Sequence, residues 1–207
     1  MQFNKKTIVF FSIFILMNVP ELFAQQVVED YWRLAQAKEE AGDYVGALQQ
    51  YNNILLVNES DKDALYQRAV VKGKMELYEL ALEDFNLALS LNPNSSMIYS
   101  GRAKAKGFLF DHLGAIEDSN KAIEMDSTNF NAYLIRGVAR MTLGDINGSL
   151  SDFEKTLSLN IQSAEAYYYA AEIYFQKKDQ LKACQFWSKA GELGYPESFS
   201  RLKKICY

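Results

Sequence analysis

The sequence predicts an all-α protein built from five consecutive antiparallel helix pairs and a closing C-terminal helix. Three observations predict this fold. The chain aligns with itself in five blocks of 34 residues without a gap, apolar positions in each block recur at helical spacing, and turn-forming residues separate the two halves of a block. The blocks are residues 28–61, 62–95, 96–129, 130–163 and 164–197.

The composition is that of a globular chain. Among 207 residues, 49% are hydrophobic, 23% are charged and three are proline, which excludes a disordered or collagen-like chain. The net charge of −4 argues against non-specific binding to nucleic acid. One histidine and two cysteines are too few for a zinc site made of those residue types alone.

Residues 1–24 are interpreted as a secretory signal peptide. Lys5 and Lys6 precede a mostly apolar run from Thr7 to Val19, and Ala24 offers a cleavage point. The run is shorter than the roughly 20 residues that a bilayer-spanning helix needs. We therefore expect a secreted or periplasmic chain of residues 25–207 without a membrane span, and the alternative is an uncleaved N-terminal anchor.

Each block is expected to fold as two helices that approach closely through small residues. Block position 8 holds alanine or glycine, position 20 holds alanine or serine, and position 24 holds an aromatic residue in every block except the third, which has Ser119. The third block is therefore expected to pack less well. The turns between the helices include Gly42-Asp43, Phe110-Asp111 and Gly144-Asp145; glycine suits the end of one helix, and aspartate can cap the next.

This pattern resembles the tetratricopeptide repeat, over residues 28–197. The resemblance implies a right-handed superhelical solenoid, in which residues 25–207 form one repeat domain and residues 198–207 cap the last repeat. The chain resembles exported bacterial proteins with this repeat in particular. The stretch from Lys189 to Gly194 is similar to the related Sel1-like repeats.

Blocks 2, 3 and 4 carry arginine at position 7 and aspartate at position 23, whereas blocks 1 and 5 carry neither. This joint occurrence predicts a salt bridge within each of the three blocks, because pairing each aspartate with the arginine of the next block would leave Arg68 and Asp152 without a partner. The alternative is an arginine row that binds an anionic ligand. The predicted pairs are Arg68 with Asp84, Arg102 with Asp118, and Arg136 with Asp152.

The two cysteines are placed on helices that should be neighbours. Cys184 belongs to the second helix of block 5 and Cys206 to the closing helix. In an oxidising compartment a disulfide between them would fix the cap to the last repeat. The alternative is two small buried apolar residues.

The resemblance also implies a binding groove lined by the first helix of each block. The inward positions of the groove carry aromatic and apolar side chains, and the charged side chains among them are mainly acidic. Such a surface suits a partner peptide or helix. The alternative interpretation is that neighbouring helices cover some of these side chains. The groove residues expected to bind are Trp32, Gln36, Tyr66, Val70, Lys74, Lys104, Phe108, Leu134, Met141, Tyr168, Glu172 and Phe175.

No catalytic constellation, metal site or cofactor motif is recognised. The single histidine, His112, lies in a predicted turn without a partner nucleophile, and no phosphate-binding glycine loop occurs. We therefore expect a non-catalytic interaction scaffold with a protein or peptide partner, within a cell-envelope complex. The alternative is a carrier of a small apolar ligand in the same groove. The sequence leaves the partner's identity and the oligomeric state open.

Overall fold

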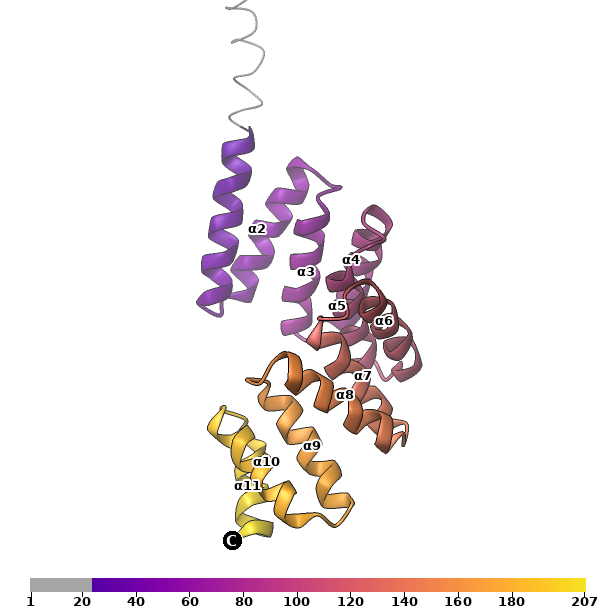
Figure 1. Cartoon of the computed structure of the whole chain (residues 1–207). Helices are drawn as coiled ribbons and strands as arrows, with labels where there is room; N and C mark the ends of the chain where they lie inside the picture. Colours follow the sequence, from indigo (N-terminus) through magenta and orange to yellow (C-terminus); the bar gives the residue numbers. More distant parts are fainter. Residues whose placement is uncertain (1–23) are drawn as a thin grey trace, which may run out of the picture. The chain divides into compact units, whose positions relative to one another are not determined.

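The computed structural model describes residues 24–207, and the regular structure within this range is helical throughout (Figure 1). The predicted signal peptide falls almost entirely on residues 1–23, outside the described residues. The chain divides into two compact units, one ending at Leu77 and the other running from Tyr78 to Tyr207. Each unit is described by itself.

Residues 24–77, the described part of the first unit, contain three helical segments. Residues 24–40 are helical, and they are followed by α2 (Tyr44–Val57) and α3 (Lys62–Lys74). Helices α2 and α3 pack against each other. The buried core combines small and large side chains, namely Ala35, Ala47, Tyr51, Ile54, Ala64, Leu65 and Ala69.

The second unit continues the helix pairs in chain order. Its helices are α4 (Tyr78–Leu91), α5 (Ser96–Phe108), α6 (His112–Met125), α7 (Phe130–Thr142), α8 (Ile146–Leu159), α9 (Ala164–Gln176), α10 (Gln180–Glu192) and α11 (Glu197–Arg201), and α11 leads into a π-helical segment, η1 (Leu202–Cys206). Each helix packs against the next, from α4 through α11 (Figure 1). The predicted all-α fold of consecutive helix pairs is confirmed, and its closing element is a short helix with a widened last turn.

Every block turns between its two helices through a residue with positive φ at block position 15. These residues are Gly42, Glu76, Phe110, Gly144 and Lys178, with φ of 73°, 63°, 63°, 87° and 66°. In four blocks the next residue is an aspartate whose side chain accepts a hydrogen bond from the first turn of the following helix, as Asp111 does from the Gly114 amide at 2.9 Å. Only two of the five turns use glycine, although this backbone region costs other residues about 1–2 kcal/mol.

Replacing Phe110 with glycine should stabilise the protein. The Phe110 side chain is 84% exposed, so Phe110→Gly sacrifices little burial and removes the cost of the left-handed conformation. Part of this gain is offset because glycine makes the unfolded chain more flexible, so we expect the free energy of unfolding to rise by about 0.5–1 kcal/mol. Urea denaturation followed by circular dichroism measures it.

The control is Leu113→Gly, which removes an apolar side chain that is 66% exposed from the first turn of α6, where φ is negative. Glycine lowers the free energy of unfolding by up to about 1 kcal/mol in a helix interior and by less in the first turn, so we expect a loss here. Equal losses in the two variants would show that the turn at residue 110 carries no backbone cost.

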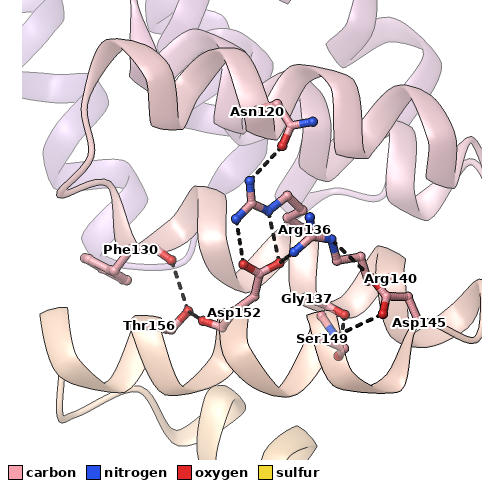
Figure 2. Close-up of polar contacts among 10 residues, drawn as sticks. Asn120, Phe130, Arg136, Gly137, Arg140, Asp145, Ser149, Asp152 and Thr156 are labelled. Atoms are coloured by element: carbon pink, nitrogen blue, oxygen red, sulfur yellow. Dashed lines mark hydrogen bonds and ion pairs between the residues drawn. The ribbon is translucent and has the colours of Figure 1, made fainter.

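The fourth block has hydroxyl side chains, Ser149 and Thr156, at positions where most other blocks have alanine, and both hydroxyls bond to the backbone. The Ser149 hydroxyl donates to the Gly137 carbonyl at 2.7 Å, and the Thr156 hydroxyl donates to the Asp152 carbonyl at 2.9 Å (Figure 2). A Cβ added at Gly137 would lie 2.7 Å from Cε1 of the buried Phe153 ring. Glycine at this position therefore makes room for the aromatic side chain.

The third block carries a buried polar group in the place of an aromatic ring. Ser119 is fully buried, and its hydroxyl has no hydrogen-bond partner within the described residues. Burying a hydroxyl without a partner opposes folding, because the group loses its bonds to water. Whether the block as a whole packs less well stays a prediction.

We expect Ser119→Ala to raise the free energy of unfolding by about 1 kcal/mol, since it removes the unpaired hydroxyl at nearly constant volume. Ser149→Ala is the matched control: it deletes the bond to the Gly137 carbonyl and should lower stability by a similar amount. Both are measured by urea denaturation. Destabilisation by both variants would indicate that Ser119 has a partner that the geometry does not reveal.

Candidate functional site

A buried carboxylate connects the two helices of block 3. Arg102, on α5, donates from Nε and Nη2 to the two carboxylate oxygens of Asp118, on α6, each at 2.8 Å. Lys106 lies one helical turn further along α5, with its Nζ 2.8 Å from Asp118. The Asp118 side chain is only 2% exposed. The carboxylate is thus satisfied by a bidentate guanidinium and an ammonium, as a buried charge requires.

Block 4 repeats this arrangement (Figure 2). Arg136 donates to the two Asp152 carboxylate oxygens at 3.0 and 2.7 Å, and Arg140 donates from Nη1 to Asp152 at 2.8 Å. These guanidinium groups are engaged by the protein itself, so the geometry favours a structural role over an anion-binding arginine row. The third predicted pair, Arg68 with Asp84, joins residues of the two units and stays a prediction.

The same arginines also contact the preceding block, which the sequence analysis did not anticipate. Arg102 donates from Nη1 to Asn86 at 2.7 Å, and Arg136 donates from Nη1 to Asn120 at 2.7 Å. Arg68 makes the equivalent bond to Asn52, at 2.8 Å. A signal for this contact is in the sequence, because asparagine occupies block position 25 only in the blocks that precede an arginine at position 7.

The junction between blocks 4 and 5 uses a different contact. Block 4 has Glu154 at position 25, block 5 has Ala170 at position 7, and the Tyr174 hydroxyl donates to Glu154 at 2.9 Å. Desolvation is the main cause that raises the pKa of Tyr174. A neutral phenol therefore replaces a guanidinium as the donor between these two blocks.

The buried ion pair should show strong energetic coupling. Asp118→Ala leaves two cations without their anion and should lower the free energy of unfolding by about 3 kcal/mol. Arg102→Ala should cost less, because Lys106 still faces Asp118. The double variant should cost less than the sum of the two, by about 1–3 kcal/mol, in a double-mutant cycle measured by denaturation.

Arg33 and Asp30 provide the control cycle. They form an ion pair of 2.8 Å with side chains that are 78% and 45% exposed, so their coupling should be below about 0.5 kcal/mol. Burial raises the pKa of Asp118, but the bonds from Arg102 and Lys106 outweigh it and hold this pKa below 3.8. The coupling should therefore persist above about pH 4 and disappear as the pH falls through the lowered pKa. Equal coupling in the two cycles would contradict a buried pair.

In the first unit, the expected groove residues are partly engaged with their own neighbours. The Trp32 ring packs edge-on against Tyr51, with 5.4 Å between the ring centres. The Lys74 ammonium lies 2.7 Å from the Glu39 carboxylate. Gln36 is exposed, while Tyr66 and Val70 are half-buried.

In the second unit, α5 and α7 present groove positions of different exposure. Phe108 is 51% exposed, and one face of its ring stacks on Tyr78 at 4.6 Å. Lys104 is exposed and Met141 is half-buried. Leu134 corrects the prediction: it is only 9% exposed, because it belongs to the core where α7 packs against its neighbours, and it is not available to a partner.

A charge of opposite sign interacts with Lys104. Burial raises the pKa of Glu165, at the start of α9, and the Lys104 charge offsets part of this rise. An acidic and a basic group thus belong to α9 and α5, the helices that also carry Phe175 and Phe108.

Two groove positions of block 5, Tyr168 and Glu172, are engaged by the C-terminal end of the chain, and the third, Phe175, contacts α10. Tyr168 stacks on Tyr195 with 4.7 Å between the ring centres. Glu172 accepts hydrogen bonds from the Trp187 indole at 3.0 Å and from Arg201 at 2.5 Å. Phe175 is 39% exposed, and its ring lies 5.6 Å from that of Trp187.

Cys184 and Cys206 form a disulfide that joins α10 to η1, with 5.9 Å between the Cα atoms. No group of three or more histidine, cysteine, aspartate or glutamate side chains suited to a metal ion occurs among residues 24–207. Within the same part of the chain, each helix is too short or too polar to cross a membrane.

Two segments match family models described as tetratricopeptide repeat, residues 62–95 and residues 165–198. The chain therefore contains tetratricopeptide repeats. The first match coincides with block 2, and the second begins one residue after block 5 does. The Sel1-like end and the exported type stay predictions. No curated protein matches the chain.

Solved structures share the fold at low sequence identity. A thermophilic tetratricopeptide repeat protein of Thermus thermophilus has 21% identity and a TM-score of 0.74, over 86% of this chain and 98% of that one. YrrB, described as having an unusual peptide-binding site, has 20% identity and a TM-score of 0.61, over 87% and 97%. PilW, a type IV pilus biogenesis factor, has 21% identity and a TM-score of 0.72, over 81% and 78%.

Proposed function

We propose that this protein is a non-catalytic interaction scaffold that binds a partner peptide or helix on the first helices of its repeats. It acts in a cell-envelope complex, in a secreted or periplasmic location. The observation that carries the proposal is the exposure of large apolar groups at first-helix positions. Phe108 on α5 and Phe175 on α9 are 51% and 39% exposed.

The chemistry of these positions suits a peptide partner. Aromatic side chains with one face exposed supply contact area at a low entropic cost, since they have few rotatable bonds. Lys104 shares α5 with Phe108, and Glu165 shares α9 with Phe175, so these helices also carry charged groups that can fix the register of a bound segment. Leu134, which is buried, is left out of the proposed surface.

Two further observations support the location and the kind of partner. The N-terminal sequence has the pattern of a secretory signal, with Lys5 and Lys6 before an apolar run. YrrB is described as having a peptide-binding site and PilW as a pilus biogenesis factor, and both share this fold. These relationships support a peptide partner and an envelope role here.

Removing two first-helix aromatics, the half-buried Tyr66 and the exposed Phe108, should strongly reduce capture of the partner. We expect Tyr66→Ala/Phe108→Ala to recover at least tenfold less of it from envelope extracts than the wild type, because anchor side chains dominate binding energy. The captured protein is identified by mass spectrometry, and a synthetic peptide of its bound segment is titrated by fluorescence anisotropy.

The control variant is Leu87→Ala/Leu113→Ala, which removes apolar side chains, 47% and 66% exposed, from the second helices α4 and α6. It should retain capture. Circular dichroism checks that both variants are folded. Equal recovery from all three proteins would remove the first-helix surface from the function, and a small molecule retained in native mass spectra of the wild type would favour the carrier instead.

A further inference from the structure

The C-terminal segment, residues 195–207, consists of the last three residues of block 5 and the predicted cap, and it engages two of the expected binding residues on α9. Tyr195 stacks on Tyr168, and Arg201 pairs with Glu172. The Arg201 guanidinium also lies over the Trp187 ring, 5.8 Å from its centre. The segment thus supplies an aromatic ring and a cation to an acidic, aromatic surface.

The contact is close where the segment crosses α10. A Cβ added at Gly191 would lie 3.1 Å from the Ser198 hydroxyl oxygen and 3.4 Å from the Phe199 ring. Ser198 is fully buried. The segment is therefore seated against the repeat.

Part of the segment faces solvent, although the Gln180 side-chain amide donates to the Ile205 carbonyl at 2.8 Å and Ile205 packs on the core of the second unit. Leu202 is buried, but Phe199 is 58% exposed and Tyr207 is 97% exposed. Helix α11 has five residues, too few to be stable by itself. The Cys184–Cys206 disulfide is the covalent fastening at the far end of the segment, and both cysteines are partly exposed.

We propose that residues 195–207 are a tethered occupant of the last repeat's binding surface, and that reduction of the Cys184–Cys206 disulfide frees this surface for a partner segment of the same chemistry. That partner carries an arginine six residues after an aromatic residue, as Arg201 follows Tyr195. The partner part of this inference rests on the proposed function, whereas the release of the segment does not.

The release is a thiol–disulfide exchange with a dithiol. One thiolate of the dithiol attacks a cystine sulfur, forms a mixed disulfide and displaces the other cysteine as a thiolate. The second thiol of the reagent then displaces the remaining cysteine. The protein gains two electrons and two protons as two thiols, and the reagent leaves as a disulfide.

Hydrogen exchange of the full chain tests the release. On reduction with dithiothreitol, amides in residues 195–205 should exchange at least tenfold faster, while those of α2 and α3 are unchanged. Cys206→Ser should show the fast exchange with or without dithiothreitol. Unchanged exchange over residues 195–205 in the reduced protein and in Cys206→Ser would overturn the proposal.

A peptide in trans tests the surface. The probe is a fluorescein-labelled peptide of residues 195–205, and the receptor is the full-length Arg201→Ala chain, in which the tethered segment competes less. The peptide should bind at least tenfold more tightly after dithiothreitol is added. The receptor Cys206→Ser/Arg201→Ala should bind it equally with and without the reagent.

Two controls define the chemistry. The open receptor is the Cys206→Ser/Arg201→Ala chain. Adding Glu172→Gln to it should remove peptide binding, because the Glu172 carboxylate is the partner of Arg201. A peptide that carries Arg201→Ala should bind none of the receptors. Two results would overturn the proposal: peptide binding to the Arg201→Ala chain that does not depend on reduction, or no peptide binding to the open receptor. Capture at Tyr66 and Phe108 is measured separately, so its failure would reject the proposed function and leave the release of the segment standing.

Discussion

The rest of this structure depends on one constraint: the paired helices approach each other closely through small side chains. Ala47, Ala115, Ala122 and Ala183 are completely buried. Because such contacts leave no room for water, every polar group placed there needs a partner on the facing helix or on its own backbone. Asp118 finds two cations, and Ser119, in the same helix, finds no partner within the described residues.

The arginines of the repeats extend this constraint from one block to the next. In the second unit, the guanidinium of Arg102 contacts the carboxylate of its own block and the amide of Asn86 in the preceding block. A planar, rigid group with several donors suits this double role, which a lysine cannot fill. The side chain that neutralises a buried charge thus also fixes the spacing between neighbouring helix pairs.

The sequence predicts the helix pairs well, because small and large residues recur at fixed block positions, and paired helices explain that recurrence. It is less informative about a contact whose residues do not recur from block to block. Leu134 has the period of a surface position, yet the neighbouring helices cover it. Glu172 is engaged by Arg201, which follows the last block and has no equivalent in the others. The left-handed turn at Phe110 follows from the geometry of the helix pair, since phenylalanine has no preference for it.

The contact between Gly137 and Phe153 has a consequence for how the sequence can diverge. The ring is completely buried, so a Cβ at residue 137 is accommodated only if the ring or the helix that carries it shifts. Blocks 1, 2 and 5 combine a buried alanine with a buried aromatic ring at the same two positions, so the fold has room for both once the helices are spaced for them. Enlarging residue 137 is therefore expected to alter the spacing of one helix pair without abolishing it.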